Sequence, residues 1–378
     1  MRLFPTRHFL GNGLLRSALS CALLAMVLLG LYACAPAEKP IKIGAIVSLS
    51  GAGSHLSAFR DGLLLAVEDL NSSGGINGRP VKLLIEDSRS TPEGGEEAFH
   101  RLEKEQPLFY IVTLSAVAVK VAELAEAAKV PLIASTTAVS HITHNREWIF
   151  RYWGTVEDEI PPIVAILNKN QIKKLGILYL NEPYGKALNS KLTAVYAKEG
   201  MRVTSLPLDK KQNDCSGELQ QLHDTEAIYV GGYVGQAQMV FGQARKNGYQ
   251  GRLLSASGGS APAVRTMAEG EGAYVASPLI YNRDYPYARE LSRKYAAKFN
   301  TPLTHFAAAA HDILQLVPQL LNGQEVSRES LKKMLEQGYS FPGAMGDILV
   351  PKESHEINFK LYPARIQEGE LQYLGLIL

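Results

Sequence analysis

Cysteine is scarce in this chain of 378 residues, which contains three, at positions 21, 34 and 215. The first two lie in the N-terminal stretch, so Cys215 is the only cysteine in the body of the sequence. The body therefore has no pair of thiols that could form an internal disulfide. Cys215 also has no histidine beside it in the sequence that could activate a thiolate, so we expect an incidental surface thiol and not a nucleophile.

Charge of one sign is lacking as well. The formal net charge is +2, and no run of lysine and arginine occurs anywhere in the sequence. We therefore expect no nucleic-acid partner. Hydrophobic residues make up 46% of the chain and charged residues 20%, which is typical of a globular protein with a large core. The length favours two domains over one.

The signatures of the common enzyme classes are missing. The sequence contains no G-x-S-x-G elbow, no phosphate-binding G-x-x-x-x-G-K-[ST] loop and no H-E-x-x-H zinc motif. Gly51-Ala52-Gly53 lacks the third glycine of a dinucleotide-binding fingerprint. His141 and His144 stand in a polar loop, where two lone histidines are usually solvated and do not bind a metal. We therefore expect a protein that is not an enzyme and that holds no cofactor and no metal.

Long apolar runs are confined to the N-terminus. Three arginines precede an apolar run from about residue 18 to residue 31, which is shorter than a membrane span and has the layout of a secretory signal. The run ends in Leu31-Tyr32-Ala33-Cys34, which resembles a lipobox with Cys34 as the lipidated N-terminus. We expect a signal peptide over 1–33 and a lipidated tether over 34–40, which would anchor the protein to a membrane of the cell envelope or periplasm. An ordinary signal with a chance cysteine is the alternative, because Tyr32 is bulkier than that motif usually has.

A strand–helix–strand pattern opens the body of the chain. The apolar run 41–49 fits a buried strand, and a polar, glycine-rich turn follows it at 50–54. Apolar residues then recur at helical spacing from Phe59 to Leu70, and a second strand covers 81–85. Such a unit predicts a parallel sheet with its ligand-facing loops at the carboxyl ends of the strands. The loop from Ser48 to Ser57 is therefore the first place to look for a site.

The same alternation continues along the chain and then restarts. A strand at 108–112 ends just before Ser115, which begins another helix, and a further strand covers 131–134. A hydroxyl at a helix N-terminus can satisfy free backbone N–H groups, and that end of a helix can also accept a carboxylate. Alternation that restarts near residue 174 indicates a second doubly wound lobe.

Several of these stretches resemble one known family. The strand written IKIG, the SG loop after it and the helix that ends in NSSGGINGR closely resemble the opening of the periplasmic leucine/isoleucine/valine-binding proteins, the solute-binding subunits of ABC importers. Farther on, YVGGY at 229–233 and QARKNG at 243–248 resemble that family's YYGGY and QARxxG with matching spacing. The resemblance covers about Ile41 to the C-terminus.

The resemblance implies a type I periplasmic binding fold. This is an α/β fold with two doubly wound parallel-sheet lobes joined by a hinge of three crossings. By this resemblance the first lobe covers 41–153 and 278–343, the main part of the second lobe covers 154–277, and 344–378 forms the end of the second lobe and a tail.

The resemblance also implies a set of ligand-binding residues. Ser115 and Thr136 should hold a carboxylate or a similar acceptor group, aided by the backbone N–H of Ala138. Tyr184 and Tyr233 should line the cleft from the second lobe. Two further candidates are His55 or its neighbour Leu56, where the family places an aromatic, and Trp153, which at a crossing either stacks on the ligand or packs in the core.

Ser257 departs from the family pattern. At the matching position the family has a Glu or Asp, which pairs with the α-ammonium group of the ligand. A hydroxyl cannot supply that charge, and a buried ammonium group without a counter-charge costs several kcal/mol. Either another acid replaces it, with Glu157 and Asp158 the nearest candidates, or the ligand lacks an ammonium group.

These features predict a solute-binding lipoprotein of an ABC importer. It would act as a monomer that captures a small amino acid or a carboxylate- or amide-like ligand by hinge closure and delivers it to the permease. A ligand sensor that uses the same clamp for regulation is an alternative. A hydrolase on an α/β scaffold is a third reading, against which the missing nucleophile argues.

Overall fold

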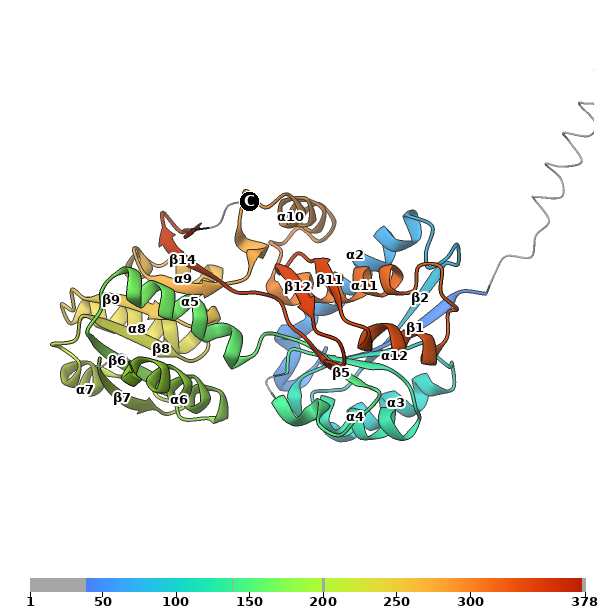
Figure 1. Ribbon diagram of the computed structural model, residues 1–378, viewed down its shortest axis with the longest axis horizontal. Coiled ribbons are helices and arrows are strands. Elements are labelled where there is room, and N and C mark those ends of the chain that lie inside the picture. The colour runs from blue at the N-terminus through green and yellow to red at the C-terminus, as the bar shows by residue number, and fades with distance from the viewer. Residues whose placement is uncertain (1–38, 138, 199–200, 376–378) are drawn as a thin grey trace, which may run out of the picture. The chain divides into compact units, whose positions relative to one another are not determined.

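The computed structural model describes residues 39–375 except 138, 199 and 200 (Figure 1). The predicted signal peptide, the lipidation site Cys34 and most of the tether therefore lie outside the described residues. Within the described part, no helix combines the length and the apolar character that crossing a bilayer requires.

The first sheet has six strands in the order β13-β5-β4-β3-β1-β2, and all neighbouring pairs are parallel. Together with its helices it forms the first lobe. Its strands are β1 (Ile41–Val47), β2 (Val81–Asp87), β3 (Tyr110–Thr113), β4 (Leu132–Ser135), β5 (Ile149–Tyr152) and β13 (Glu356–Ile357). Its main helices are α2 (Ser57–Ser72), α3 (Pro92–Glu103), α4 (Ser115–Ala127), α10 (Pro286–Phe299), α11 (His305–Leu320) and α12 (Arg328–Glu336).

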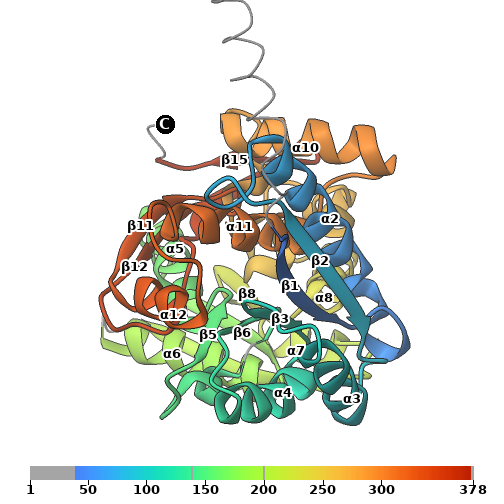
Figure 2. The same ribbon diagram turned by 90° about the vertical axis from the view of Figure 1, so that its right-hand side faces the viewer.

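Alternation along β1 explains the layers of this lobe. Ile43, Ala45 and Val47 belong to one core with apolar residues of α2 and α11, whereas Ile46 belongs to another core with residues of α3 and α4. Successive strand residues point to opposite faces, so one strand can supply both cores. Figure 2 shows α2 on one side of β1 and β2, and α3 and α4 on the other.

Gly62 sets the distance between α2 and α11. A Cβ atom at this position would lie 2.2 Å from the backbone oxygen of Ala307, so the two helices could not approach as closely with a larger residue. The later part of the chain therefore packs directly on the first helix of the lobe.

The second sheet has seven strands in the order β15-β14-β10-β9-β8-β6-β7. The five strands from β10 to β7 in this order pair in parallel, as predicted. The strand β14 is antiparallel to both of its neighbours, β10 and β15. Its strands are β6 (Lys174–Leu180), β7 (Arg202–Leu208), β8 (Ala227–Gly231), β9 (Arg252–Ser255), β10 (Tyr274–Ser277), β14 (Tyr362–Gln367) and β15 (Glu370–Tyr373). Its helices are α5 (Val156–Lys169), α6 (Pro183–Lys198), α7 (Ser216–Gln221), α8 (Val234–Lys246) and the short α9 (Pro262–Arg265).

The chain passes between the two sheets three times: after β5, after β10 and after β13. The third crossing lies later than the predicted boundary at residue 343. A two-stranded hairpin, β11 (Tyr339–Pro342) with β12 (Asp347–Val350), is followed by β13, which extends the first sheet beside β5. The side chains of Glu356 and Arg151 form an ion pair at 2.6 Å, which stabilises this edge strand. The crossing therefore falls between Ile357 and Tyr362.

The expectation that Cys215 is a surface thiol is wrong, because its side chain is fully buried. Its Sγ lies 3.3 Å from Oε1 of Gln243 on α8, and burial raises the pKa of the thiol to about 11. A thiol in this state is inert near neutral pH.

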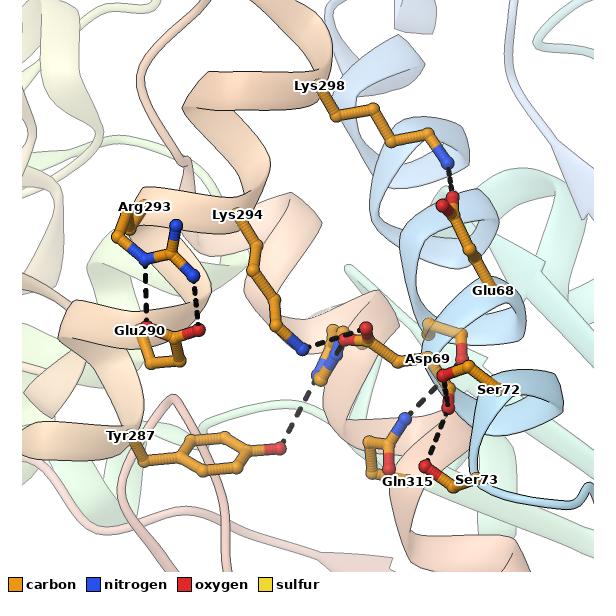
Figure 3. Close-up of polar contacts among 12 residues, drawn as sticks. Glu68, Asp69, Ser72, Ser73, Tyr287, Glu290, Arg293, Lys294, Lys298 and Gln315 are labelled. Atoms are coloured by element: carbon orange, nitrogen blue, oxygen red, sulfur yellow. Dashed lines mark hydrogen bonds and ion pairs between the residues drawn. The ribbon is translucent and has the colours of Figure 1, made fainter.

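A charged cluster joins α2, α10 and α11 in the first lobe (Figure 3). The carboxylate of Asp69 accepts hydrogen bonds from Lys294 at 2.8 Å and lies 3.3 Å from Nε2 of the buried His311, while Lys298 pairs with Glu68. The hydrogen bond from His311, together with that from Lys294, holds the pKa of Asp69 below its ordinary value. The contacts of Asp69 with Lys294 and His311 therefore stabilise the lobe most while Asp69 is ionised.

Replacing Asp69 by asparagine should lower the unfolding temperature near neutral pH. A carboxyl group with a depressed pKa contributes stability above its unfolded pKa of about 3.9 and loses it as the pH falls through the folded value. The difference between wild type and Asp69→Asn should therefore shrink in acid, which thermal melts between about pH 3 and pH 7 would measure. Asp61→Asn, on the same helix but paired with Arg60 of that helix, is the control. A difference that does not depend on pH would contradict this account.

Candidate functional site

Hydroxyl side chains gather where β3 and β4 end in the first lobe. Ser115 is the first residue of α4, and the hydroxyl of Thr137, just after β4, donates to its Oγ at 3.0 Å. Thr137 is fully buried, whereas Ser115 is partly exposed. Because Ser115 accepts from Thr137, its own hydroxyl hydrogen remains able to donate to a ligand oxygen.

Two strained residues hold these loops beside each other. Leu114 and Thr136, which follow β3 and β4, have φ angles of 72° and 54°. Such a conformation is unfavourable for a side chain with a Cβ, and more so for a β-branched one, and costs about 1–3 kcal/mol per residue. The N–H of Leu114 donates to Oγ1 of Thr136 at 3.2 Å, which ties the two loops together. Strain of this kind is concentrated at functional sites.

Arg151 fixes the same region from the neighbouring strand β5. Its guanidinium donates to the backbone oxygen of Thr137 at 3.3 Å and forms the ion pair with Glu356. Since Arg151 is almost fully buried, this charge is compensated inside the lobe. We assign Arg151 to positioning the loop after β4 and not to contacting a ligand.

A second polar group lies in the other lobe, around the side chain of Glu159 in the first turn of α5. Its Oε2 accepts from the backbone N–H of Ser257 at 2.7 Å, and its Oε1 accepts from the hydroxyls of Ser257 at 2.6 Å and of Tyr184 at 2.8 Å. Ser257 follows β9 and Tyr184 follows β6, so both come from carboxyl ends of strands in the second sheet. The geometry therefore brings two predicted residues onto one carboxyl group.

The two predicted tyrosines of this lobe stack on each other. The ring centroids of Tyr184 and Tyr233 lie 5.2 Å apart with 10° between the ring planes. Tyr233 is 48% exposed, which is unusual for a large aromatic residue in this protein. A stacked pair with one exposed face provides an apolar wall for a small ligand.

Glu159 is a buried acid that has no cationic partner within the described part of the chain. Its side chain is 5% exposed, and among the described residues no lysine, arginine or histidine forms an ion pair with it. Burial raises the pKa of Glu159, although the hydrogen bonds from Ser257 and Tyr184 favour the ionised form. A buried carboxyl group in this state is costly unless a positive charge is supplied.

The two acids named from the sequence as nearest to Ser257 have other partners. Glu157 is exposed and pairs with Lys191 of α6 at 2.9 Å. Asp158 accepts from the backbone N–H of Thr155 at 2.8 Å and from the hydroxyl of Thr155 at 2.6 Å, which caps α5. Glu157 therefore links α5 to α6 and Asp158 caps α5, and neither has a hydrogen bond to Ser257 among the described contacts.

Helical spacing in the sequence could have indicated that Glu159 is buried. It lies three residues after Val156 and four before Ile163, so it shares the apolar face of α5. An acid on the buried face of a helix is rare unless it has a role. Thr137 had a weaker signal, because hydroxyl residues fill every position from 135 to 137 and only the structure selects the one that contacts Ser115.

The remaining predicted residues are placed as follows. Trp153 packs at the first crossing, with its ring parallel to that of Phe306 at 6.1 Å and edge-on to that of Phe359 at 6.1 Å. His55 lies in the 3-10 turn Gly51–Leu56 after β1, and Ala138 is outside the described residues. Their contacts with a ligand stay predictions.

A cavity of about 710 Å³ lies at another place, next to the second crossing. Its lining includes Arg265, Tyr281, Arg283 and Glu370, and Glu370 pairs with Arg283 at 2.5 Å. None of the predicted ligand residues lines this cavity, so we do not assign the main site to it.

Comparison with known proteins covers nearly the whole body of the chain. The profile of the periplasmic binding protein family matches residues 40–370. The chain is 27% identical over 234 residues to Leu/Ile/Val-binding protein homolog 3 of Brucella melitensis biotype 1. That match covers 59% of this chain and 62% of the relative, which is less than two thirds of its length.

Solved structures share the fold. A branched-chain amino acid transporter substrate-binding protein of Streptococcus pneumoniae, in complex with isoleucine, has a TM-score of 0.72 at 22% identity, covering 89% of this chain and 99% of that one. A solute-binding protein of an ABC transporter from R. palustris, in complex with benzoate, has a TM-score of 0.72 at 19% identity, covering 89% and 96%. Both are type I periplasmic binding folds, and the three-crossing α/β architecture described above agrees with them.

Proposed function

Because this chain belongs to the periplasmic binding protein family, we propose that it is the solute-binding component of an ABC importer, which captures a small amino acid or a carboxylate- or amide-like solute and delivers it to a permease. One observation supports this proposal most: each lobe presents a polar group at the carboxyl ends of its strands. The first contains Ser115 and Thr137, and the second contains Glu159, Ser257 and Tyr184. Ligands of doubly wound sheets bind at these ends.

The proposed mechanism is capture by hinge closure. Three crossings join the lobes, and segments of this kind can absorb the backbone changes of a domain rotation. In the closed state Ser115 and Thr136 would donate to a carboxylate or another acceptor group of the solute, aided by the N–H of Ala138. Tyr184 and Tyr233 would cover it from the second lobe, with His55 contributing from the first loop. The closed form would then dock on the permease.

The proposed function also implies a place in the cell and requires no catalysis. We place the protein in the periplasm or cell envelope, anchored to a membrane through a lipid on Cys34, and we expect it to act as a monomer. It needs no catalytic residue, since the solute leaves unchanged. The buried, inert Cys215 agrees with that reading.

A thermal-shift screen of the purified protein tests this function. The panel should hold α-amino acids together with carboxylates and amides that lack an ammonium group. A solute at a hundred times its dissociation constant should add about 2.7 kcal/mol of stability and raise the unfolding temperature by a few degrees. No shift with any compound at millimolar concentration, together with turnover of generic ester substrates, would contradict the proposal and favour a hydrolase.

A further inference from the structure

The carboxyl group of Glu159 occupies the loop where the resembled family has its own acid. Ser257 stands at that family position, and both its backbone N–H and its hydroxyl donate to Glu159. Glu159, in the first turn of α5, thus places its carboxyl oxygens within 2.7 Å of two atoms of Ser257.

The bonding of Glu159 leaves room for one more donor. An ionised carboxylate has about four acceptor positions on its two oxygens. Oε1 accepts two hydrogen bonds, from Ser257 and Tyr184, whereas Oε2 accepts one, from the N–H of Ser257. An N–H group of a cationic ligand can take the remaining position on Oε2.

The electrostatics favour a cation there. Three neutral donors orient the carboxylate but supply no positive charge, and no cationic side chain of the described residues pairs with it. The stacked pair of Tyr184 and Tyr233 stands beside it, and the faces of aromatic rings attract cations. A ligand cation would complete a buried ion pair whose acidic half is already oriented.

We propose that Glu159 pairs with a cationic nitrogen of the solute, so that the protein takes small α-amino acids or related ammonium compounds and not ammonium-free carboxylates. This inference rests on the function proposed above. It selects one of the two possibilities that the serine at 257 leaves open.

Matched ligand pairs and matched variants test it by isothermal titration calorimetry. Each α-amino acid is compared with the carboxylate that lacks only its amine, for example leucine with 4-methylpentanoate and alanine with propanoate. Wild type, Glu159→Gln and the control Glu157→Gln are titrated with each pair. Glu157→Gln removes a charge from the same helical turn but from an exposed residue that pairs with Lys191.

Wild type should bind the amino acid at least about 30-fold more tightly than its deaminated partner, because a buried charge that loses its partner is costly. Glu159→Gln should lose about that factor for the amino acid and little for the carboxylate, while Glu157→Gln should behave as wild type. In the double variant Glu159→Gln/Ser257→Asp the charge returns to the family position, and preference for the amino acid should return with it.

Other outcomes separate the two proposals. If Glu159→Gln weakens both members of a pair equally, with an unchanged unfolding temperature, Glu159 only positions Ser257 and Tyr184 and the charge assignment is wrong. If wild type binds ammonium-free carboxylates and no amino acid, this inference fails while the solute-binding function stands. If wild type binds neither set and none of the amides of the thermal-shift panel, both fail.

Discussion

Replacing Ser115 by alanine should weaken binding of the cognate solute by about 10- to 100-fold, which corresponds to the loss of one hydrogen bond to a charged or buried group. Ser115 accepts from Thr137, so its hydroxyl hydrogen is directed by a buried neighbour that is itself fixed through Arg151. The variant removes the only donor hydrogen that this pair can offer to a ligand oxygen. It leaves α4 and the sheet in place.

Calorimetric titration of wild type, Ser115→Ala and Thr137→Val measures this effect. Thr137→Val should weaken binding less than Ser115→Ala, because it removes the group that orients Ser115 and not the proposed donor. Ser72→Ala, at the end of α2, is the control, because in the described part of the chain that hydroxyl donates to the backbone oxygen of Asp69 and to no ligand-facing group. Equal affinities for wild type and Ser115→Ala would show that the carboxylate is not held at this position.

Replacing Asp312 by alanine should cost about 3–5 kcal/mol of stability. Asp312 lies on α11 and is fully buried. It accepts from the backbone N–H groups of Ala344 at 2.7 Å and Met345 at 3.0 Å, and from the hydroxyl of Tyr152 at 2.8 Å. These donors belong to the end of β5 and to the turn between β11 and β12, so one carboxyl group satisfies three buried donors from two distant segments.

Thermal unfolding measures the loss, which should lower the midpoint by roughly 5–15 °C. Tyr152→Phe removes a single donor and should cost about 1 kcal/mol. The control is Asp284→Ala, since Asp284 is exposed. A loss for Asp312→Ala no larger than that for Asp284→Ala would mean that the three donors find other partners.

Local periodicity predicted the elements that carry regular patterns. Apolar residues at helical spacing from Phe59 to Leu70 predicted a helix that the structure bounds at Ser57 and Ser72, and the apolar run from Ile41 predicted β1. Spacing of this kind reflects which face of an element is buried, and that is a local property. Strand–helix alternation that restarts near residue 174 predicted the second lobe, whereas the hinge of three crossings was implied by the resemblance to a family, and the comparisons confirm that family.

Features that depend on contacts between residues far apart in the chain could not be predicted from the sequence. The third crossing lies after β13 because Glu356 meets Arg151, a residue 205 positions away in the chain. Burial of Cys215 depends on its contact with Gln243 of α8, and α7 and β8 lie between the two residues in the chain. Among the three acids at 157–159, helical spacing places Glu159 on the buried face of α5, but its contact with Ser257, 98 positions away, is visible only in the structure.

Closure of the two lobes around a solute is the central claim, and small-angle X-ray scattering tests it most directly. The radius of gyration should be measured across a titration with the solute that gives the largest thermal shift. We predict a decrease that saturates at the same ligand concentration as the calorimetric binding curve, and a smaller decrease for Ser115→Ala at that concentration. Tight binding with an unchanged radius of gyration would contradict capture by hinge closure.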